Sequence, residues 1–323
     1  MKTPMKLLAS ALLVLATLLH AASFAQEYPA KPVTIVIPFP PGGSNDVLGR
    51  FLADRLGKLW NQSVIVENRP GGGSSIGSNS VAKAPPDGYR MVLVSSSYTT
   101  NAATRTDLPF DPLKDLKPVS MIARGQVAVL TGSRVPMATL ADLARESKTK
   151  TIFYGTAGVG STQHFYAELL NDAMGIKMTG VPYKGGQEAL LDLQAGRIDV
   201  VVGSLGGLLA TAAGGKGKLI AVLGKSRATV APTVPTATES GFKDAQADNY
   251  WAMFVPTATP DTIARKIHEG IRVVTHTPEG RQFLAKMDGE PTESSEAEVT
   301  AFVKTEIDYW TKLARKLNIS ATN

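Results

Sequence analysis

The residues best suited to contact a ligand lie in two glycine-rich loops that each end in hydroxyl or amide side chains. The first, residues 38–46, reads Pro-Phe-Pro-Pro-Gly-Gly-Ser-Asn-Asp, and the second, residues 155–162, reads Gly-Thr-Ala-Gly-Val-Gly-Ser-Thr. Each loop follows an apolar run and precedes an amphipathic segment, which predicts a strand, a tight loop and a helix N-terminus. Because the unpaired N–H groups and the dipole of such a terminus attract anions, the two loops predict a site for a small carboxylate.

The two loops do not match nucleotide-binding motifs. No Gly-Lys-Ser/Thr follows the glycines of the first loop, so it is not a Walker A motif. The second loop reads G-x-x-G-x-G, and dinucleotide binders have G-x-G-x-x-G. Glycines that serve only tight turns would give the same patterns, and this alternative stays open for each loop alone. The presence of two equivalent loops in one chain favours a ligand-binding cleft over simple turns.

The titratable residues near the loops each allow two interpretations. Asp46 could cap a helix, or it could hold the loop and meet a substrate amine or hydroxyl. His164 could line a pocket or make a simple polar contact. The other histidines of the later chain, His268 and His276, do not have metal-ligand spacing. We expect no catalytic residue, no metal site and no cofactor.

The first 25 residues have the pattern of a cleavable secretory leader. Lys2 and Lys6 precede an apolar core at residues 7–19, and Ser23-Phe24-Ala25 is a small-x-small cleavage site. The chain has no cysteine, so we expect neither a lipoprotein nor a disulfide framework. No later stretch is long and apolar enough to span a bilayer. We therefore predict an exported protein that is free in solution.

Cleavage after Ala25 would leave 298 residues (323 minus 25), enough for about two domains. Loss of two lysines would lower the formal net charge from +6 to +4. This modest positive charge can help to steer anions. It is too diffuse for nucleic acid, because no basic cluster interleaves with aromatic residues.

Hydrophobic periodicity predicts two α/β sets joined by crossing strands. The first set has strands at 33–38, 63–67 and 91–94, helices at 45–59 and 76–83, and a hydroxyl-rich loop at 95–101. A crossing strand at 127–130 leads to a second set with strands at 151–154, 178–181, 198–202 and 219–223 and helices at 163–174 and 187–194. The chain returns through 250–255 and finishes on helices near 261–274, 279–286 and 296–317. Ligands of open α/β sheets sit beyond the carboxyl ends of the strands, so two facing sets would form a clamp.

Several motifs resemble the Bug receptors, the substrate-binding proteins of tripartite tricarboxylate transporters. They occur in the family's order over nearly the whole mature chain, at residues 38–46, 66–73, 81–89, 108–120, 181–185 and 196–199. The resemblance implies an α/β, two-domain periplasmic-binding-protein fold (type II-like) with a ligand cleft between the domains and two crossovers. Domain 1 would comprise residues 27–124 plus 230–323, and domain 2 residues 125–229. It also implies a periplasmic monomer.

The resemblance carries ligand-binding roles onto matching positions of this chain. Family members hold a carboxylate between the two loops through backbone groups, hydroxyls and water. The implied contacts are Phe39, Gly43, Ser44, Asn45, Asp46, Ser96, Thr156, Ala157, Gly160, Ser161, Thr162 and His164. Relatives usually have an acidic residue after the strand at 198–202, whereas this chain has Gly203 and Ser204. We expect this change to widen the cleft and to favour a second negative group.

Three functions remain open on these residues. The leading one is a periplasmic receptor that captures a di- or tricarboxylate, an aromatic carboxylate or an acidic amino acid for the membrane subunits of a tripartite tricarboxylate transporter. A second is a receptor that reports its ligand to a membrane sensor kinase. A periplasmic enzyme on the same scaffold is the third, and the lack of an evident base–nucleophile pair argues against it.

Overall fold

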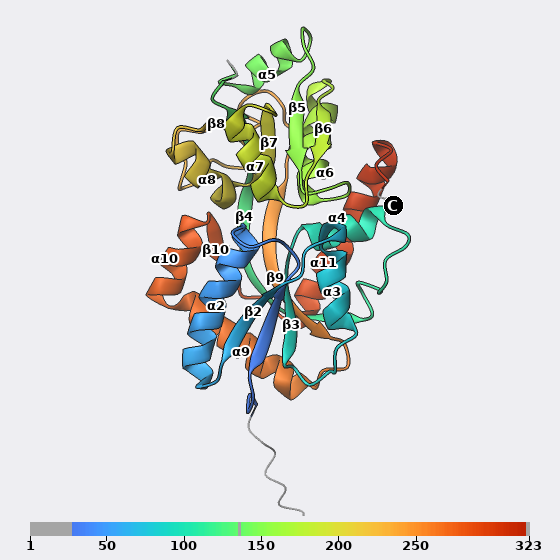
Figure 1. The fold of residues 1–323 in the computed structure, drawn as a ribbon, viewed down its shortest axis with the longest axis vertical. Helices are drawn as coiled ribbons and strands as arrows, with labels where there is room; N and C mark the ends of the chain where they lie inside the picture. The colour runs from blue at the N-terminus through green and yellow to red at the C-terminus, as the bar shows by residue number, and fades with distance from the viewer. Residues whose placement is uncertain (1–27, 135–136, 321–323) are drawn as a thin grey trace, which may run out of the picture.

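The computed structural model describes residues 28–134 and 137–320, so the predicted leader lies outside the described residues. Two α/β lobes stand one above the other, and two long strands run between them (Figure 1). We call the lower one the first lobe and the upper one the second lobe. This confirms the two-domain α/β fold that the sequence predicts.

The first lobe is built from both ends of the chain. Its strands are β1 (Val33–Ile37), β2 (Val64–Asn68), β3 (Arg90–Ser95) and β10 (Gly289–Pro291). Its helices are α2 (Ser44–Trp60), α3 (Ser75–Ala82), α4 (Ser97–Thr104), α9 (Asp261–His276) and α10 (Pro278–Lys286), with a 3-10 turn η1 (Gly72–Ser74). The β-branched strand β1 is parallel to β2 on one side and to β3 on the other. Leu48, Leu52 and Leu56 of α2 are fully buried at helical spacing, which fixes this helix on the sheet.

The second lobe repeats this arrangement. Its strands are β5 (Phe153–Thr156), β6 (Thr179–Pro182), β7 (Val200–Ser204) and β8 (Gly217–Val222). Its helices are α5 (Leu140–Glu146), α6 (Thr162–Met174), α7 (Gly186–Ala195) and α8 (Leu205–Ala213). The strands β7, β5 and β6 are mutually parallel, and their carboxyl ends face the first lobe. The lobes therefore present strand ends and helix starts to each other.

Two antiparallel strands connect the lobes. The first half of β4 (Leu116–Gly132) pairs with β9 (Asp248–Pro256), and its second half pairs with β7 and β8. At the change of partner, a Cβ atom on Gly125 would lie 2.7 Å from the carbonyl oxygen of Asp288. Only glycine fits such a close approach without a shift, so this position lets β4 lie close to the segment that leads into β10.

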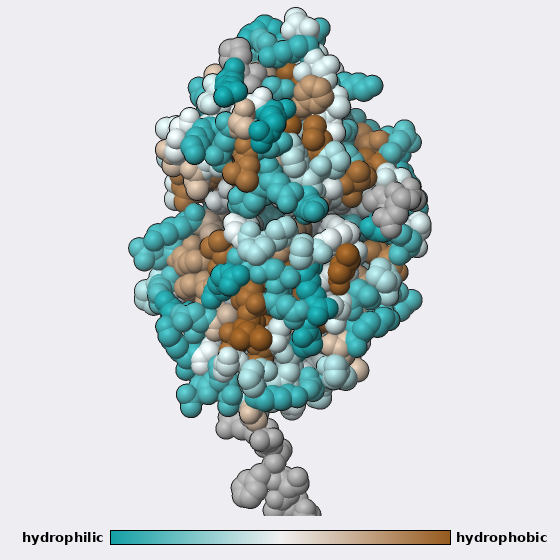
Figure 2. Space-filling model, viewed as in Figure 1, coloured by the Kyte–Doolittle hydropathy of each residue, from teal (hydrophilic) through white to brown (hydrophobic). Residues whose placement is uncertain are grey.

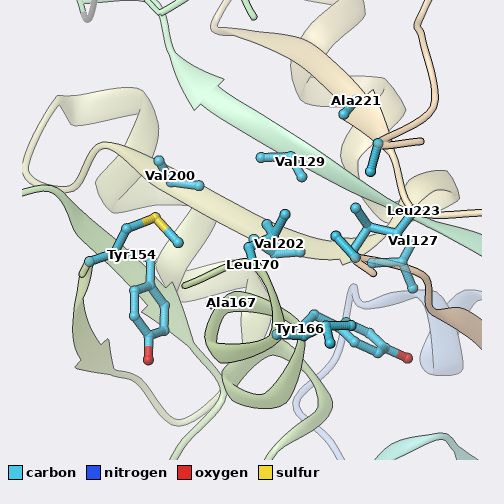
Figure 3. Close-up of a cluster of buried hydrophobic side chains, with 14 of the residues drawn as sticks. Val127, Val129, Tyr154, Tyr166, Ala167, Leu170, Val200, Val202, Ala221 and Leu223 are labelled. Carbon is cyan, nitrogen blue, oxygen red and sulfur yellow. The ribbon is translucent and has the colours of Figure 1, made fainter. Parts of the chain in front are cut away.

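The C-terminal helix α11 (Glu296–Lys316) packs on both lobes. Its first half buries Val299 and Val303 in a core of the first lobe, and its second half places Trp310 in the core of the second. The Trp310 ring meets the edges of Phe165 and Tyr166 at centroid distances of 5.2 and 5.9 Å. Figure 3 shows Tyr166 at the margin of that second-lobe core, with its hydroxyl directed away from the aliphatic cluster. The helix is thus a second link between the lobes, beside the paired strands.

Apolar side chains are mostly interior. On the face drawn in Figure 2 the surface is largely hydrophilic, with an apolar patch on the lower lobe where Figure 1 draws β2. Among the described residues, no helix has the length and hydrophobicity needed to cross a bilayer.

The structure corrects the prediction of a loop at 95–101, because most of that stretch belongs to α4. Its hydroxyls bond to carbonyl oxygens of the preceding turn: Thr99 Oγ1 donates to Ser96 O at 2.9 Å, and Thr104 Oγ1 donates to Thr100 O at 3.0 Å. Hydroxyl groups satisfied within the helix remove the competition that makes Ser and Thr poor helix formers. The expected loop is therefore a short buried helix.

The domain division stays a prediction, but the contacts favour a later second boundary. Ala237 and Ala245 are buried in the same core as β7, and Ala247 N donates to Leu223 O at 3.0 Å. We propose that the return crossing lies near Asp248 and that residues 230–247 belong with the second lobe.

The double attachment of α11 generates a stability prediction. Replacing Trp310, which is 2% exposed, with alanine should lower the free energy of unfolding by about 3–5 kcal/mol, because a large cavity is left between the helix and the second lobe. Urea unfolding followed by circular dichroism measures the change. The neighbouring Tyr309→Ala is the control, since that side chain is 44% exposed and its loss should cost under about 1 kcal/mol. Equal losses for the two variants would contradict the role given to Trp310.

Candidate functional site

A cavity of about 130 Å³ lies between the two lobes, where the strand ends face each other. The first lobe contributes Phe39, Pro40, Gly43, Ser44, Asn45 and Ser95 to its lining, and the crossing strand β9 contributes Asn249. The second lobe contributes Ala157, Ser161, Thr162, Gln163, Tyr166, Gly185, Gly186, Gln187, Glu188, Leu190, Gly203, Ser204, Gly207 and Leu208. Both predicted loops therefore reach one cavity.

Asp46 holds the first loop together from behind the cavity lining. Its Oδ2 accepts hydrogen bonds from the Gly42 amide at 2.9 Å and from Arg50 Nε at 3.0 Å, and its Oδ1 accepts one from Asn68 Nδ2 at 2.9 Å. The same Asn68 nitrogen donates to Phe39 O. Burial raises the pKa of the Asp46 carboxyl, but the bonds from Arg50, Gly42 and Asn68 outweigh it and hold that pKa below its usual value. An ionised Asp46 thus fixes the loop that carries Gly43 to Asn45.

The second loop is held by its own side chains in a similar way. Thr156 Oγ1 accepts a hydrogen bond from the Gly158 amide at 3.0 Å, and Ser161 caps α6 by accepting one from His164 N. His164 Nδ1 accepts a hydrogen bond from the Gly160 amide at 3.2 Å, so this nitrogen carries no proton. Burial lowers the pKa of His164, which keeps the imidazole neutral. His164 therefore shapes the loop and adds no positive charge to the site.

Four helices begin at this cavity: α2, α6, α7 and α8. The first N–H groups of a helix have no partner within it. Within the described part of the chain, no side chain caps the helix starts at Gly43, Gly185 or Ser204, and the Ser161 cap occupies only the His164 amide. None of the described lining residues is a lysine, arginine or histidine. The positive potential of the cavity therefore comes from backbone dipoles.

Three buried side-chain atoms of the lining have no hydrogen-bond partner among the described residues: Asn45 Nδ2, Gln163 Oε1 and Ser204 Oγ. The orientation of the Asn45 amide is fixed, because its Oδ1 accepts a hydrogen bond from Trp251 Nε1 at 3.1 Å and an indole nitrogen can only donate. The unpartnered Asn45 nitrogen is thus a donor aimed at whatever fills the cavity. Leaving such groups unpaired is costly, so they point to a polar ligand.

The lobes touch each other at the mouth of the cavity. Gln187 Nε2 of α7 donates to the carbonyl oxygen of Gly42 in the first loop at 3.0 Å. Next to this bond, a Cβ atom on Gly185 would lie 3.0 Å from the Pro40 ring. The structure is therefore a closed form, and we call this pair of contacts the Gln187 clasp.

The structure brings most of the predicted site residues to the cavity. Those that line it are Phe39, Gly43, Ser44, Asn45, Ala157, Ser161, Thr162, Gly203 and Ser204. Those that lie outside the lining are Asp46, Ser96, Thr156, Gly160 and His164. Their polar groups are engaged inside the loops or, for Ser96, with the crossing strand. Ser96 Oγ donates to Asn249 Oδ1 at 3.1 Å and accepts a hydrogen bond from Tyr250 N at 3.2 Å, so it positions Asn249, which does line the cavity.

Sequence reasoning missed the α7 side of the cavity. The pair Gly185-Gly186 follows β6 and opens α7, which is the same strand, glycine and helix-start pattern that identified the other loops. Tyr166 and Asn249 had no comparable signal, because they lie inside a helix and a crossing strand. Tyr166 donates its hydroxyl proton to Asp248 O at 2.9 Å, and burial raises its pKa far above the usual value.

One catalytic-looking motif is separate from this cavity. Residues 73–77 read Gly-Ser-Ser-Ile-Gly and match the G-x-S-x-G pattern of hydrolase nucleophiles. Ser75 is buried at the start of α3, outside the lining, and within the described residues it is not hydrogen-bonded to a histidine. The described residues also contain no cluster of three histidine, aspartate or glutamate side chains that could hold a metal.

Residues 48–319 match the family described as "Tripartite tricarboxylate transporter family receptor". A relative from Agrobacterium vitis, the UPF0065 protein of the TAR-I ttuE-ttuC' intergenic region, is 36% identical over 83% of this chain and 78% of its own length. Protein BugT of Bordetella pertussis is 30% identical over 90% of this chain and 91% of its own.

Comparison with solved structures also identifies similar periplasmic binding proteins. The periplasmic binding protein BugD superimposes with a TM-score of 0.87 at 26% identity, covering 91% of this chain and 99% of its own. Rpa4515 of R. palustris, solved with adipate, has a TM-score of 0.88 at 29% identity with the same coverage. MatC from Rhodopseudomonas palustris, solved with bound malate, has a TM-score of 0.84 at 27% identity over 88% of this chain and 99% of its own. The chain therefore belongs to the tripartite tricarboxylate transporter receptor family and is a periplasmic-type solute-binding protein.

Proposed function

We propose that the cleft binds a small organic acid through its carboxylate and closes over it. The observation that carries this proposal is the convergence of four helix N-termini on a cavity whose lining has no lysine, arginine or histidine among the described residues. Backbone N–H groups and the Asn45 amide are suited to hold a carboxylate, because hydrogen bonds to a charged group are the strong ones.

The residues that line the cavity would make the direct contacts with the ligand. Asn45, Thr162 and Ser204 are the central polar residues among them. The predicted residues outside the lining act through them: Asp46 and His164 hold the two loops, and Ser96 holds Asn249. Phe39 and Leu208 supply apolar walls. The candidate ligands are di- or tricarboxylates, aromatic carboxylates and acidic amino acids, and the adipate and malate bound to two structural neighbours support a carboxylate as the group that is recognised.

We propose further that the protein works in the periplasm and delivers its ligand to the membrane subunits of a tripartite transporter. Family membership supports this role. A closed form that makes contacts across the cleft suits a receptor that presents its bound ligand, because closure requires tighter binding in one of two states. A receptor that reports its bound ligand to a membrane sensor kinase would use the same closed form.

The first test is a thermal-shift panel of small carboxylates on the mature protein. A ligand at about 100 times its dissociation constant should stabilise the protein by ~2.7 kcal/mol, because it binds only the folded form. Uncharged amides of the same acids are the controls and should give smaller shifts. A panel in which no carboxylate raises the melting temperature would count against the proposed function.

The second test uses Asn45→Asp with the best ligand of the panel. The carboxylate oxygens keep the bond from Trp251 but replace the free donor with negative charge, so affinity should fall about tenfold to a hundredfold or more. Isothermal titration calorimetry measures the change. Asn318→Asp, on the exposed surface, alters the net charge equally and should leave the affinity unchanged. Unaltered binding by Asn45→Asp would remove this residue from the site.

The Gln187 clasp gives a kinetic prediction. Gln187→Ala removes the bond to Gly42 O and should raise the ligand dissociation rate several-fold, with little change in the association rate, because only the closed state loses a contact. Stopped-flow fluorescence measures both rates. Gln194→Ala on the same helix is the control, since Gln194 is outside the lining. Equal dissociation rates for the two variants would show that the clasp does not retain the ligand.

A further inference from the structure

Among the described lining residues of the cavity, one has a charged side chain, and it is an acid. Glu188 is the third residue of α7, and its Oε2 accepts a hydrogen bond from the Lys184 amide at 2.9 Å. The carboxylate therefore sits at the N-terminus of the helix that it belongs to. It uses the positive potential of that terminus, which is then not available to a ligand.

The charge balance of the cavity limits what it can hold. A helix N-terminus carries about half a positive charge, so the starts of α2, α6, α7 and α8 together supply roughly two. Asp46 is paired with Arg50 at 3.0 Å behind the lining and leaves this balance unchanged. Glu188 removes one unit. The remaining potential matches a ligand with a single negative charge.

The uncharged polar groups of the lining also fit a ligand with a single negative charge. Gln163 Oε1 is buried without a partner among the described residues and lines the cavity, so it presents an acceptor that requires a donor. The Gln163 side chain also fills the space beside Gly203, because its Nε2 would lie 3.3 Å from a Cβ atom at that position. The room that a small residue at 203 was expected to give a second negative group is therefore taken up.

We infer that the cleft selects organic acids with a net charge of −1 that carry a hydrogen-bond donor away from their carboxylate, and that Glu188 is the residue that rejects a second, uncompensated carboxylate. This inference rests on the proposed function and narrows its ligand to the monovalent acids of that class, unlike the dianions adipate and malate that two structural neighbours bind. A divalent acid would place its extra charge in a cavity without a cationic side chain among the described lining residues, next to an acid of the same sign.

The test compares pairs of acids of similar length in which an uncharged group replaces the second carboxylate. Adipate is paired with 6-hydroxyhexanoate and malate with 3-hydroxybutyrate, each titrated by calorimetry at about pH 7.5, where all the carboxyls are ionised. In the wild type the monoanion of each pair should bind about tenfold or more tightly than the dianion. In Glu188→Gln, which keeps the acceptor for the Lys184 amide, this preference should disappear or reverse.

Two further variants separate charge from structure. Glu188→Asp keeps the negative charge and should keep the preference for monoanions. Glu146→Gln, on α5 outside the lining, removes one charge from the same lobe and should not alter the preference. The inference is overturned if the dianions bind more tightly in the wild type, or if Glu188→Gln leaves the ratio unchanged. Failure of every acid in both pairs and in the wider panel contradicts the proposed function itself.

Discussion

The structure depends on the N–H groups that every helix leaves unpaired at its start. Such groups must find a partner when they are buried, and an α-helix cannot supply one from within. Here four starts face one cavity, and glycine or serine stands at each cap position, so the chain's own side chains leave most of these donors free. The cavity is thereby receptive to an anion without a cationic side chain in its described lining.

The arrangement of strands brings these helix starts together. In each lobe, parallel strands end at the cleft and the following helix begins there. The strand β4 belongs to both sheets, and α11 packs on both cores, so the lobes are joined on two sides of the molecule. The lobes are therefore held together by these connections, and the contacts at the mouth of the cavity can be few. The bond from Gln187 to Gly42 is one of them.

Much of the fold and part of the site follow from local sequence patterns, and the remainder depends on tertiary contacts. The strand, glycine and helix-start pattern locates both loops, because each part of it is local. It does not tell which polar side chain turns inward: Asp46 and His164 bind amides of their own loops, and Ser44 and Thr162 line the cavity. The helix α4 was missed because its threonines satisfy their hydroxyls on its own backbone. Asn249 lies on a crossing strand, where no local pattern marks a ligand contact.

The use of dipoles in place of charged side chains also affects how a ligand arrives. The field of a dipole falls off with distance more steeply than that of a charge, and ions in solution screen what remains outside the cavity. An acid therefore meets little attraction from this site until it is between the lobes. For the carboxylate ligand proposed above, long-range attraction is then left to the net charge of the protein, and differences in affinity among acids would arise mainly from how long each one stays. A receptor built in this way would discriminate among its ligands by retention.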